Sequence, residues 1–239
     1  ILKKPANERF KLLRETDHPQ AQFLWAVFRD VFHYIAVHLE SIADNARDVD
    51  FAIRWGFGWN EGPFETWQSA GWKEIAGWVS EDIAAGKGLS TAPLPAWVSE
   101  IEGVHTAAGS YAPAKKAFVP RSTLPVYQRQ AFPAALVGEN GADPKTAGTT
   151  VLENDAIRLW HQGDDVLIAS FKTKMNTIGP DVLDGLVQAI EIAEKDYAGL
   201  VIWQTGSITG GPFSAGADLQ AAMPLFMQGG AKAVEPFVK

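Results

Sequence analysis

Hydrophobic side chains recur at spacings of three and four residues between positions 21 and 46, which predicts a long helix. The stripe consists of Leu24, Phe28, Val31, Ile35, Leu39 and Ile42, widened by Phe23, Val27 and Tyr34. A helix that is apolar on several sides is buried deeply or lies at a subunit interface. Shorter helices are predicted near 47–55, 63–70, 72–85 and 94–102, where Pro63 and Pro95 suit first-turn positions.

Residues 105–149 are rich in proline and glycine, so regular helix is not expected there. With Leu124, Tyr127 and Phe132, the stretch is too apolar for a flexible linker surrounded by water. We therefore interpret this stretch as an extended connecting segment that packs on the surface of a domain. It divides the chain into a helical domain at 1–104 and a different domain at 150–239.

The hydrophobic period changes after residue 150. Two apolar runs at 157–160 and 166–170 flank Gly163-Asp164, which predicts a hairpin with a glycine-containing turn. A helix is predicted from about 180 to 195, followed by a strand at 199–204 that is covered on both faces, a glycine-rich loop, and a helix near 218–227. The fold class is therefore α followed by α/β, the latter an incomplete ββαβ unit with a right-handed crossover. Such a unit is expected to expose strand edges and apolar faces.

Composition narrows the function classes. The 239 residues are 46% hydrophobic and carry 21 basic against 28 acidic side chains, a net charge of −7, so no basic surplus exists for a nucleic-acid backbone. There is no cysteine, and no apolar run is long enough to span a bilayer. With no visible signal peptide, we expect a cytoplasmic protein without nucleic-acid or membrane partners. Both ends look cut, and we interpret the chain as an internal fragment of a longer protein.

Three features resemble functional motifs without meeting their requirements. The run from Gly56 to Gly62 follows a predicted helix where a dinucleotide fingerprint needs a strand, and its sixth position is Glu61 where the fingerprint needs glycine. The five histidines show no ligand spacing with carboxylates, so no metal site is expected. Asp164-Asp165 lies in a predicted turn and favours solvation over catalysis.

The segment with the clearest chemical potential runs from Gly210 to Leu219, after a buried strand and before a helix. Small residues at 215–217 let a ligand approach the backbone. Amide N–H groups at a helix start carry partial positive charge and can hold a developing oxyanion such as a thioester enolate. The alternative is a tight turn in which Asp218 is the helix N-cap. The residue pattern alone favours the turn.

The run Phe213-Ser214-Ala215-Gly216-Ala217-Asp218-Leu219 resembles the signature of the crotonase (enoyl-CoA hydratase/isomerase) superfamily. Lys174-Met175-Asn176-Thr177-Ile178 is similar to the short asparagine-containing segment that precedes that family's first long helix. The hairpin, helix and strand between them follow the family's order. The resemblance covers residues 150–239.

The stretch from Val49 to Trp67, with its Gly-Phe-Gly and Gly-Pro-Phe runs, resembles the helical C-terminal domain of 3-hydroxyacyl-CoA dehydrogenases. A dehydrogenase followed by a hydratase is the order in one class of bifunctional fatty-acid β-oxidation enzymes. The chain therefore resembles the middle of such an enzyme, and an acyl-CoA thioester is the implied substrate.

The crotonase resemblance implies site residues. The Ala217 N–H corresponds to one of two oxyanion donors, and Thr173, Lys174, Met175, Ala215, Gly216 and Asp218 are expected to line the coenzyme A groove. Gln220 stands where many relatives have a lysine that meets CoA phosphates, so the chain departs from the family's pattern at that contact. The second donor, the hydratase glutamates, the dehydrogenase histidine and glutamate, and the NAD loop are expected outside this chain.

Three function hypotheses follow. The first is a parent enzyme with NAD-dependent 3-hydroxyacyl-CoA dehydrogenase and enoyl-CoA hydratase activities, of which this piece alone is expected to be inactive. The second is a non-catalytic oligomerisation or interdomain scaffold, motivated by the stripe at 21–46. The third is a crotonase of other chemistry, such as an isomerase, dehalogenase or thioester hydrolase. A second copy of the chain and a thiolase are candidate partners.

Overall fold

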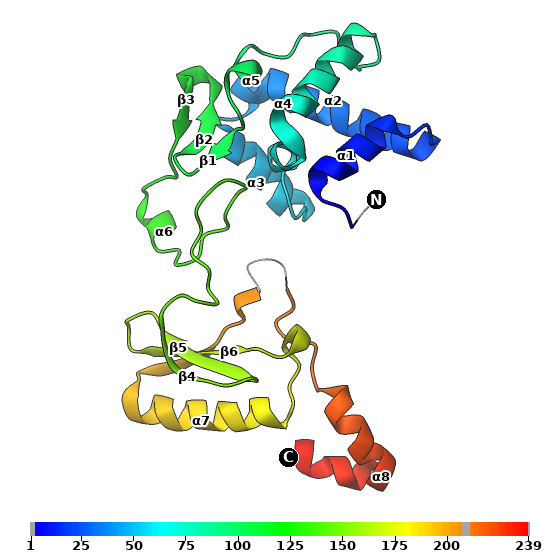
Figure 1. Cartoon of the computed structure of the whole chain (residues 1–239). Helices are drawn as coiled ribbons and strands as arrows, with labels where there is room; N and C mark the ends of the chain where they lie inside the picture. Colours follow the sequence, from blue (N-terminus) through cyan, green and yellow to red (C-terminus); the bar gives the residue numbers. More distant parts are fainter. Residues whose placement is uncertain (1–2, 207–210, 239) are drawn as a thin grey trace. The chain divides into compact units, whose positions relative to one another are not determined.

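The computed structural model describes residues 3–206 and 211–238, and the chain forms two compact units, residues 1–141 and 142–239 (Figure 1). The structure is mixed helix and sheet. Most predicted elements are present close to their predicted bounds, although the first unit contains two further helices and a small sheet that hydrophobic periodicity did not indicate. The two units are described separately.

Five helices form the larger part of the first unit: α1 (Ala6–Glu15), α2 (Pro19–Ile42), α3 (Ala46–Phe57), α4 (Pro63–Ala84) and α5 (Trp97–Glu100). Aromatic rings fill the core between them, and the rings of Trp67 and Trp72 stack with centroids 4.2 Å apart. The predicted helices at 63–70 and 72–85 are one element with a break at Gly71, whose φ of 109° is open to glycine.

The first unit also contains much of the stretch predicted to connect two domains. A three-stranded antiparallel sheet is formed by β1 (His105–Thr106), β2 (Gly109–Ala112) and β3 (Ala117–Val119), with η1 (Pro113–Lys115) between the last two and α6 (Pro125–Gln128) after them. Tyr111 and Leu136 are buried, and Arg47 of α3 pairs with Glu139 at 3.3 Å. Burial of side chains from residues 105–141 therefore ties this stretch to the helices, and the division between units falls after residue 141.

The second unit is a four-stranded sheet with one long helix on a face (Figure 1). Its elements are β4 (Thr149–Glu153), β5 (Ile157–His161), β6 (Val166–Phe171), η2 (Lys174–Asn176), α7 (Pro180–Asp196), β7 (Gly199–Ile202) and α8 (Leu219–Val238). The strand order is β4-β5-β6-β7, antiparallel except for the parallel β6–β7 pair. The predicted hairpin is β5–β6, and β4 is a strand that the alternation of side chains did not indicate.

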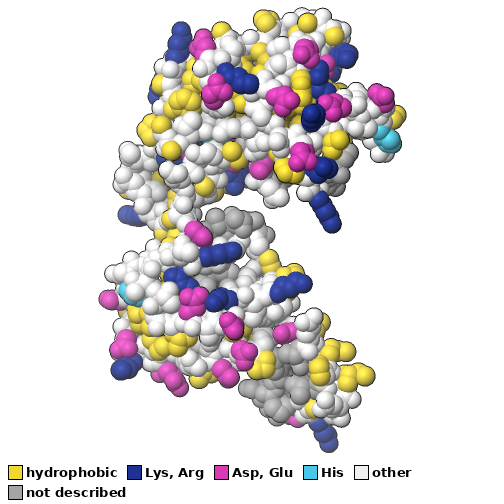
Figure 2. Space-filling view, in the orientation of Figure 1, with side chains coloured by type: hydrophobic (Ala, Val, Ile, Leu, Met, Phe, Trp, Pro, Cys, Tyr) yellow, Lys and Arg dark blue, Asp and Glu magenta, His cyan; other side chains and the backbone are white. Residues whose placement is uncertain are grey.

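The prediction that β7 is covered on both faces is wrong. Val201 is 47% exposed and Ile202 is 39% exposed, because β7 pairs only with β6 among the described residues and α7 covers one face of the sheet. Further large apolar side chains lie exposed along α8, where Figure 2 shows hydrophobic atoms on the surface. The second unit therefore presents a strand edge and apolar surface.

Candidate functional site

Two short segments of the second unit, residues 173–178 and 212–218, lie side by side. The Ala215 N–H donates to the Met175 carbonyl at 3.1 Å, and the Ile178 N–H donates to the Gly216 carbonyl at 2.9 Å. The structure thus brings together residues that lie about forty positions apart and that the sequence had singled out separately.

Side chains reinforce this pairing. The Asn176 side-chain amide donates to the Pro212 carbonyl at 2.8 Å, and the Ser214 hydroxyl donates to the Asn176 carbonyl at 2.6 Å. The same hydroxyl accepts the Gly216 N–H at 3.0 Å. Ser214 therefore links the Asn176 segment to the peptide unit immediately before the proposed oxyanion donor.

The Gly216–Ala217 peptide is oriented by these contacts. Gly216 has a φ of 88°, a conformation that glycine adopts readily, and its carbonyl is held by Ile178. Because N–H and C=O point in opposite directions across a trans peptide, the Ala217 N–H is directed away from the Ile178 segment. No acceptor lies within hydrogen-bonding distance of this N–H among residues 3–206 and 211–238. The donor is therefore available to a ligand.

Asp218, the residue after Ala217, is the helix N-cap of the alternative interpretation. Its carboxylate accepts the Gln220 N–H at 2.9 Å, which caps the start of α8 at Leu219. Its own N–H donates to the Ile178 carbonyl at 2.9 Å. The turn and the open donor thus coexist, because capping engages Asp218 and leaves the Ala217 N–H outside the helix.

The remaining predicted site residues lie at the start of the first segment. The Thr173 hydroxyl donates to the Thr177 carbonyl at 2.6 Å, and Lys174 is exposed in η2. Met175 is 57% exposed, and Ala215 and Ala217 are also exposed. The donor therefore faces solvent, where a hydrogen bond to a carbonyl competes with water. Gly210, the first residue of the predicted segment, lies outside the described residues.

A second polar cluster, in the first unit, was not predicted. The Asp50 carboxylate and the His105 Nε2 are 2.6 Å apart, and the His105 Nδ1 lies 2.9 Å from the Ser110 hydroxyl. All three residues are at most 1% exposed. A serine, a histidine and an aspartate in this order resemble a nucleophilic triad, but no substrate can reach a completely buried hydroxyl.

Asp50 has a structural task that explains its burial. Its two carboxylate oxygens accept the N–H groups of Phe64 and Glu65 at 2.8 and 3.0 Å, at the first turn of α4. These amides have no partner within their own helix. A Cβ on Gly62 would lie 2.3 Å from the Asp50 Cβ, so only glycine allows this approach. The cluster is a buried cap for α4.

Burial also governs ionisation around this cap. Burial raises the pKa of Asp50, although the hydrogen bond from His105 opposes that change. Burial likewise raises the pKa of Glu65, whose carboxylate accepts the Gly62 N–H at 2.9 Å. Glu139 behaves differently: burial raises its pKa, but the hydrogen bonds from Arg121 and the Leu136 N–H and the charges of Arg121 and Arg47 together outweigh burial and lower the pKa.

A sequence signal for the buried cap existed. Pro63 at the first helical position marks the start of α4, and Gly62 has no side chain with which to cap it. The acceptor for the first N–H groups of α4 must therefore come from another part of the chain. Asp50 lies twelve residues earlier and His105 far later in the chain, and spacing along the sequence could not identify this pairing.

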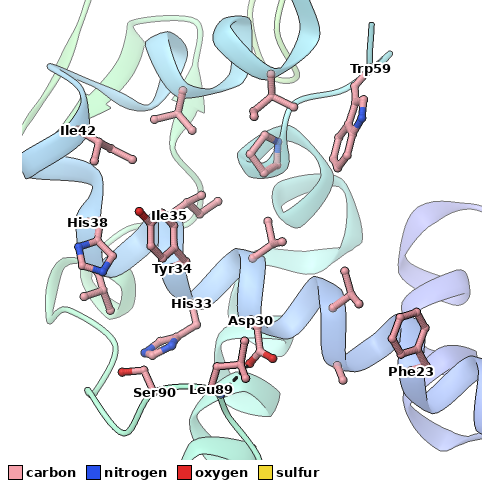
Figure 3. A pocket seen from close by; sticks show the side chains of 17 residues that line it. Phe23, Asp30, His33, Tyr34, Ile35, His38, Ile42, Trp59, Leu89 and Ser90 are labelled. Atoms are coloured by element: carbon pink, nitrogen blue, oxygen red, sulfur yellow. Dashed lines mark hydrogen bonds between the residues drawn. The ribbon is translucent and has the colours of Figure 1, made fainter. Parts of the chain in front are cut away.

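An apolar groove of about 760 Å³ lies along α2 in the first unit (Figure 3). Its lining includes Phe23, Tyr34, Ile42, Trp59 and Leu89, with Asp30, His33 and Ser90 together near Leu89. Phe23 is 67% exposed and Tyr34 is 56% exposed. The wide hydrophobic stripe predicted at 21–46 is therefore only partly buried within the unit.

The described residues offer little to a metal or a dinucleotide. They contain no group of three histidine or carboxylate side chains placed to hold a metal ion. Gly58 ends α3 and Gly62 precedes α4, so this glycine run joins two helices and lacks the preceding strand that a dinucleotide needs. In the same part of the chain, no helix is long and apolar enough to cross a membrane.

Comparisons with known proteins identify relatives for most of the chain. No protein-family model and no solved structure matches it. A "Probable 3-hydroxyacyl-CoA dehydrogenase" of Bacillus subtilis (strain 168) is 31% identical over 224 residues, which cover 90% of this chain and 25% of that protein. The chain therefore spans about a quarter of this relative.

Two further relatives carry a different name. A "Putative fatty acid oxidation complex trifunctional enzyme" of Rickettsia felis is 27% identical over 94% of this chain and 26% of its own length. The protein of the same name from Rickettsia prowazekii is 24% identical over 91% of this chain and 25% of its own length. Because each match covers at least 90% of the chain, it includes most of both units. The chain is thus related to proteins named as fatty-acid oxidation enzymes.

Proposed function

We propose that the chain belongs to a fatty-acid β-oxidation enzyme that acts on acyl-CoA thioesters. In this proposal the first unit is the helical accessory domain of an NAD-dependent 3-hydroxyacyl-CoA dehydrogenase, and the second is the thioester-binding part of an enoyl-CoA hydratase of the crotonase type. The names of the relatives support the coarse class. The observation that carries the hydratase assignment is the open N–H of Ala217 beside a paired loop.

The chemistry assigned to this donor is oxyanion stabilisation. When a nucleophile adds to an enoyl thioester, negative charge develops on the carbonyl oxygen, and a preorganised N–H that points at this oxygen lowers the barrier. The Ala217 N–H supplies one such donor. Asp218 is engaged as the cap of α8, and we assign it no proton transfer. Met175, Ala215 and Gly216 would lie along the thioester arm, with Thr173 and Lys174 nearby.

Binding tests this assignment directly. The chain is titrated calorimetrically with crotonyl-CoA and with S-butyl-CoA, a thioether that lacks the carbonyl acceptor. One hydrogen bond to the carbonyl predicts roughly two- to tenfold tighter binding of the thioester. Equal affinities would remove the reason for assigning Ala217 as an oxyanion donor.

We expect the isolated chain to hydrate crotonyl-CoA no faster than a buffer control. Its Ala217 donor is exposed to water, and the loop supplies no carboxylate beyond the engaged Asp218. The measurement is the loss of enoyl absorbance with protein purified from a host lacking its own hydratase. Turnover well above the control would show that the chain carries a proton-transfer group that we have not assigned.

A scaffold role is the second candidate, and the groove along α2 favours it. The exposed side chains of Phe23 and Tyr34 at this groove suit a second copy of the chain. In sedimentation, the wild-type chain is expected to self-associate at micromolar concentration and the Tyr34→Lys variant to do so less. A monomeric wild type at high micromolar concentration would count against this role. Other crotonase chemistries, such as isomerisation or thioester hydrolysis, share the same donor.

A further inference from the structure

We propose that Asn176 and Ser214 are positioning residues that together hold the Ala217 N–H in its ligand-facing orientation. This inference rests on the proposed function, because it concerns the donor assigned to the thioester carbonyl. Neither side chain is offered as a catalytic residue, since neither is argued to touch substrate.

The backbone at Asn176 is the first reason. Met175 and Asn176 have φ values of 55° and 53°, so two consecutive non-glycine residues adopt the left-handed conformation. This conformation is costly for residues with a Cβ and persists only where surrounding contacts maintain it. Here it accompanies carbonyls that serve the opposite segment: Met175 accepts from the Ala215 N–H, and Asn176 accepts from the Ser214 hydroxyl.

The connectivity of Ser214 is the second reason. Its hydroxyl donates to the Asn176 carbonyl and accepts from the Gly216 N–H. The Gly216 carbonyl is held in turn by the Ile178 N–H. Both polar groups of Gly216 are thus occupied: its N–H holds the Ala215–Gly216 peptide, and its carbonyl holds the Gly216–Ala217 peptide that carries the donor. The N–H of this same peptide, that of Ala217, has no acceptor among the residues that the structure describes.

The Asn176 side chain completes the clamp. Its amide donates to the Pro212 carbonyl at 2.8 Å, which anchors the loop two residues before Ser214. Asparagine tolerates the left-handed region better than most residues, so one residue type satisfies both the backbone and the side-chain requirement. Loss of either contact leaves the backbone hydrogen bonds at Ala215, Gly216 and Asp218 in place but removes a side-chain restraint on the loop before the donor, and we infer that this restraint sets the direction of the Ala217 N–H.

Substitutions separate the contributions of the Ser214 hydroxyl, the Asn176 side-chain amide and the Asn176 backbone conformation. Ser214→Ala removes the bridging hydroxyl, whereas Ser214→Thr keeps it. Asn176→Asp removes the amide donor, and Asn176→Gly removes the side chain while keeping access to positive φ. Thr149→Ala, at an exposed position of β4, is the control for loss of a hydroxyl in the same unit.

The readout is the carbonyl stretching frequency of ¹³C-labelled crotonyl-CoA bound to the full chain, measured by infrared difference spectroscopy together with its affinity. A donor aimed at the carbonyl lowers this frequency. We expect the wild type, Ser214→Thr and Thr149→Ala to retain the lowered frequency. Ser214→Ala and both Asn176 variants should return it to that of free thioester, with affinity lowered by about two- to tenfold, the contribution expected of the lost hydrogen bond.

The outcomes separate the two proposals. An unchanged carbonyl frequency in Ser214→Ala would overturn the clamp while leaving the donor assignment intact. If the wild-type chain binds no thioester, the proposed function fails, and the clamp is then decided by the Ala217 amide in the ligand-free chain. A ¹⁵N spectrum in which the Ala217 resonance moves in Ser214→Ala and returns in Ser214→Thr supports the clamp, and an unmoved resonance overturns it.

Discussion

The backbone N–H groups near a helix start have opposite environments in the two units. At the first turn of α4, the N–H groups of Phe64 and Glu65 are completely satisfied by Asp50, a residue with no exposed surface. Beside the start of α8, Asp218 caps the helix and the neighbouring Ala217 N–H keeps no protein acceptor among the described residues. An N–H group that has an acceptor inside the protein stabilises the fold. An N–H group without such an acceptor is left to bind a ligand.

The comparison also separates two kinds of suggestive pattern. The serine, histidine and aspartate in the first unit have the distances of a catalytic relay but no access to solvent. The loop in the second unit has no titrating relay, yet it presents an accessible donor. Accessibility therefore distinguishes the candidate site more sharply than residue type.

The largest expected effect comes from removing the buried cap. Asp50→Ala leaves two amides and His105 without their acceptor in the interior, which is expected to cost about 3–5 kcal/mol of unfolding free energy. Chemical denaturation followed by tryptophan fluorescence measures this, because seven of the nine tryptophans precede residue 98. Asp44→Ala, at an exposed position in the bend just before α3, is the control and should change stability little. Equal effects of the two substitutions would mean that Asp50 does not support α4.

Two glycines with similar backbone conformations test whether the Ala217 N–H depends on the backbone at Gly216. Gly216 and Gly163 have φ values of 88° and 93°, and a Cβ at either would meet no atom within 4 Å. Alanine at either position is therefore expected to cost about 1–2 kcal/mol through backbone strain alone. Amide hydrogen exchange of β5 and β6 reports this cost for the second unit.

Only one of the two variants should affect the ligand. Gly216→Ala reorients the peptide that carries the Ala217 N–H and should abolish the preference for crotonyl-CoA over S-butyl-CoA. Gly163→Ala lies in the turn between β5 and β6 and should retain that preference. If both variants retain it, the donor does not depend on the conformation of Gly216.

A smaller effect concerns the pH dependence of the first unit. Burial raises the pKa of Glu65 above 4.5, so the folded state retains this proton longer than the unfolded chain. The unfolding free energy that depends on Glu65 is therefore fully present below its ordinary pKa and is lost as the pH rises through the raised folded value. Glu65→Gln should remove this loss.

Glu139 has the opposite sign in the same unit. Burial favours its neutral form, but the hydrogen bonds from Arg121 and the Leu136 N–H and the charges of Arg121 and Arg47 together outweigh burial and lower its pKa below 4.5. Its contribution is present above the ordinary value and is lost as the pH falls through the lowered folded value. Denaturant midpoints of Glu65→Gln and Glu139→Gln, measured across the carboxylate range around pH 4, should change in opposite directions. Parallel changes would contradict this account of the two environments.

Regular elements were predictable where periodicity is strong. The helix at 180–195 and the strands at 157–160 and 166–170 are present nearly as expected, because one face of each is buried in a continuous core. The small sheet at 105–119 was not predicted, because its strands have only two to four residues each. Strand β4 was not predicted because most of its side chains are exposed, so no alternation of buried and exposed positions marks it. The edge position of β7 could not be inferred from its apolar run alone.

The candidate site was predictable in part for the same reason. The loop near Gly216 follows a strand and precedes a helix, so its residues could be identified from local order. Its pairing with Met175 and Asn176 depends on the left-handed backbone conformation of these two residues, which the sequence pattern does not predict. The Asp50–His105 contact joins residues 55 positions apart, and only the fold brings them together.

The state of the Ala217 amide tests the central claim most directly. Hydrogen exchange and ¹⁵N chemical shifts of the full chain compare this amide with those of Phe64 and Glu65, without and with crotonyl-CoA. We predict fast exchange at Ala217 in the free chain, slowing and a downfield shift with crotonyl-CoA but not with coenzyme A alone, and constant protection at Phe64 and Glu65. Strong protection of Ala217 in the free chain, or identical responses to both ligands, would contradict the account.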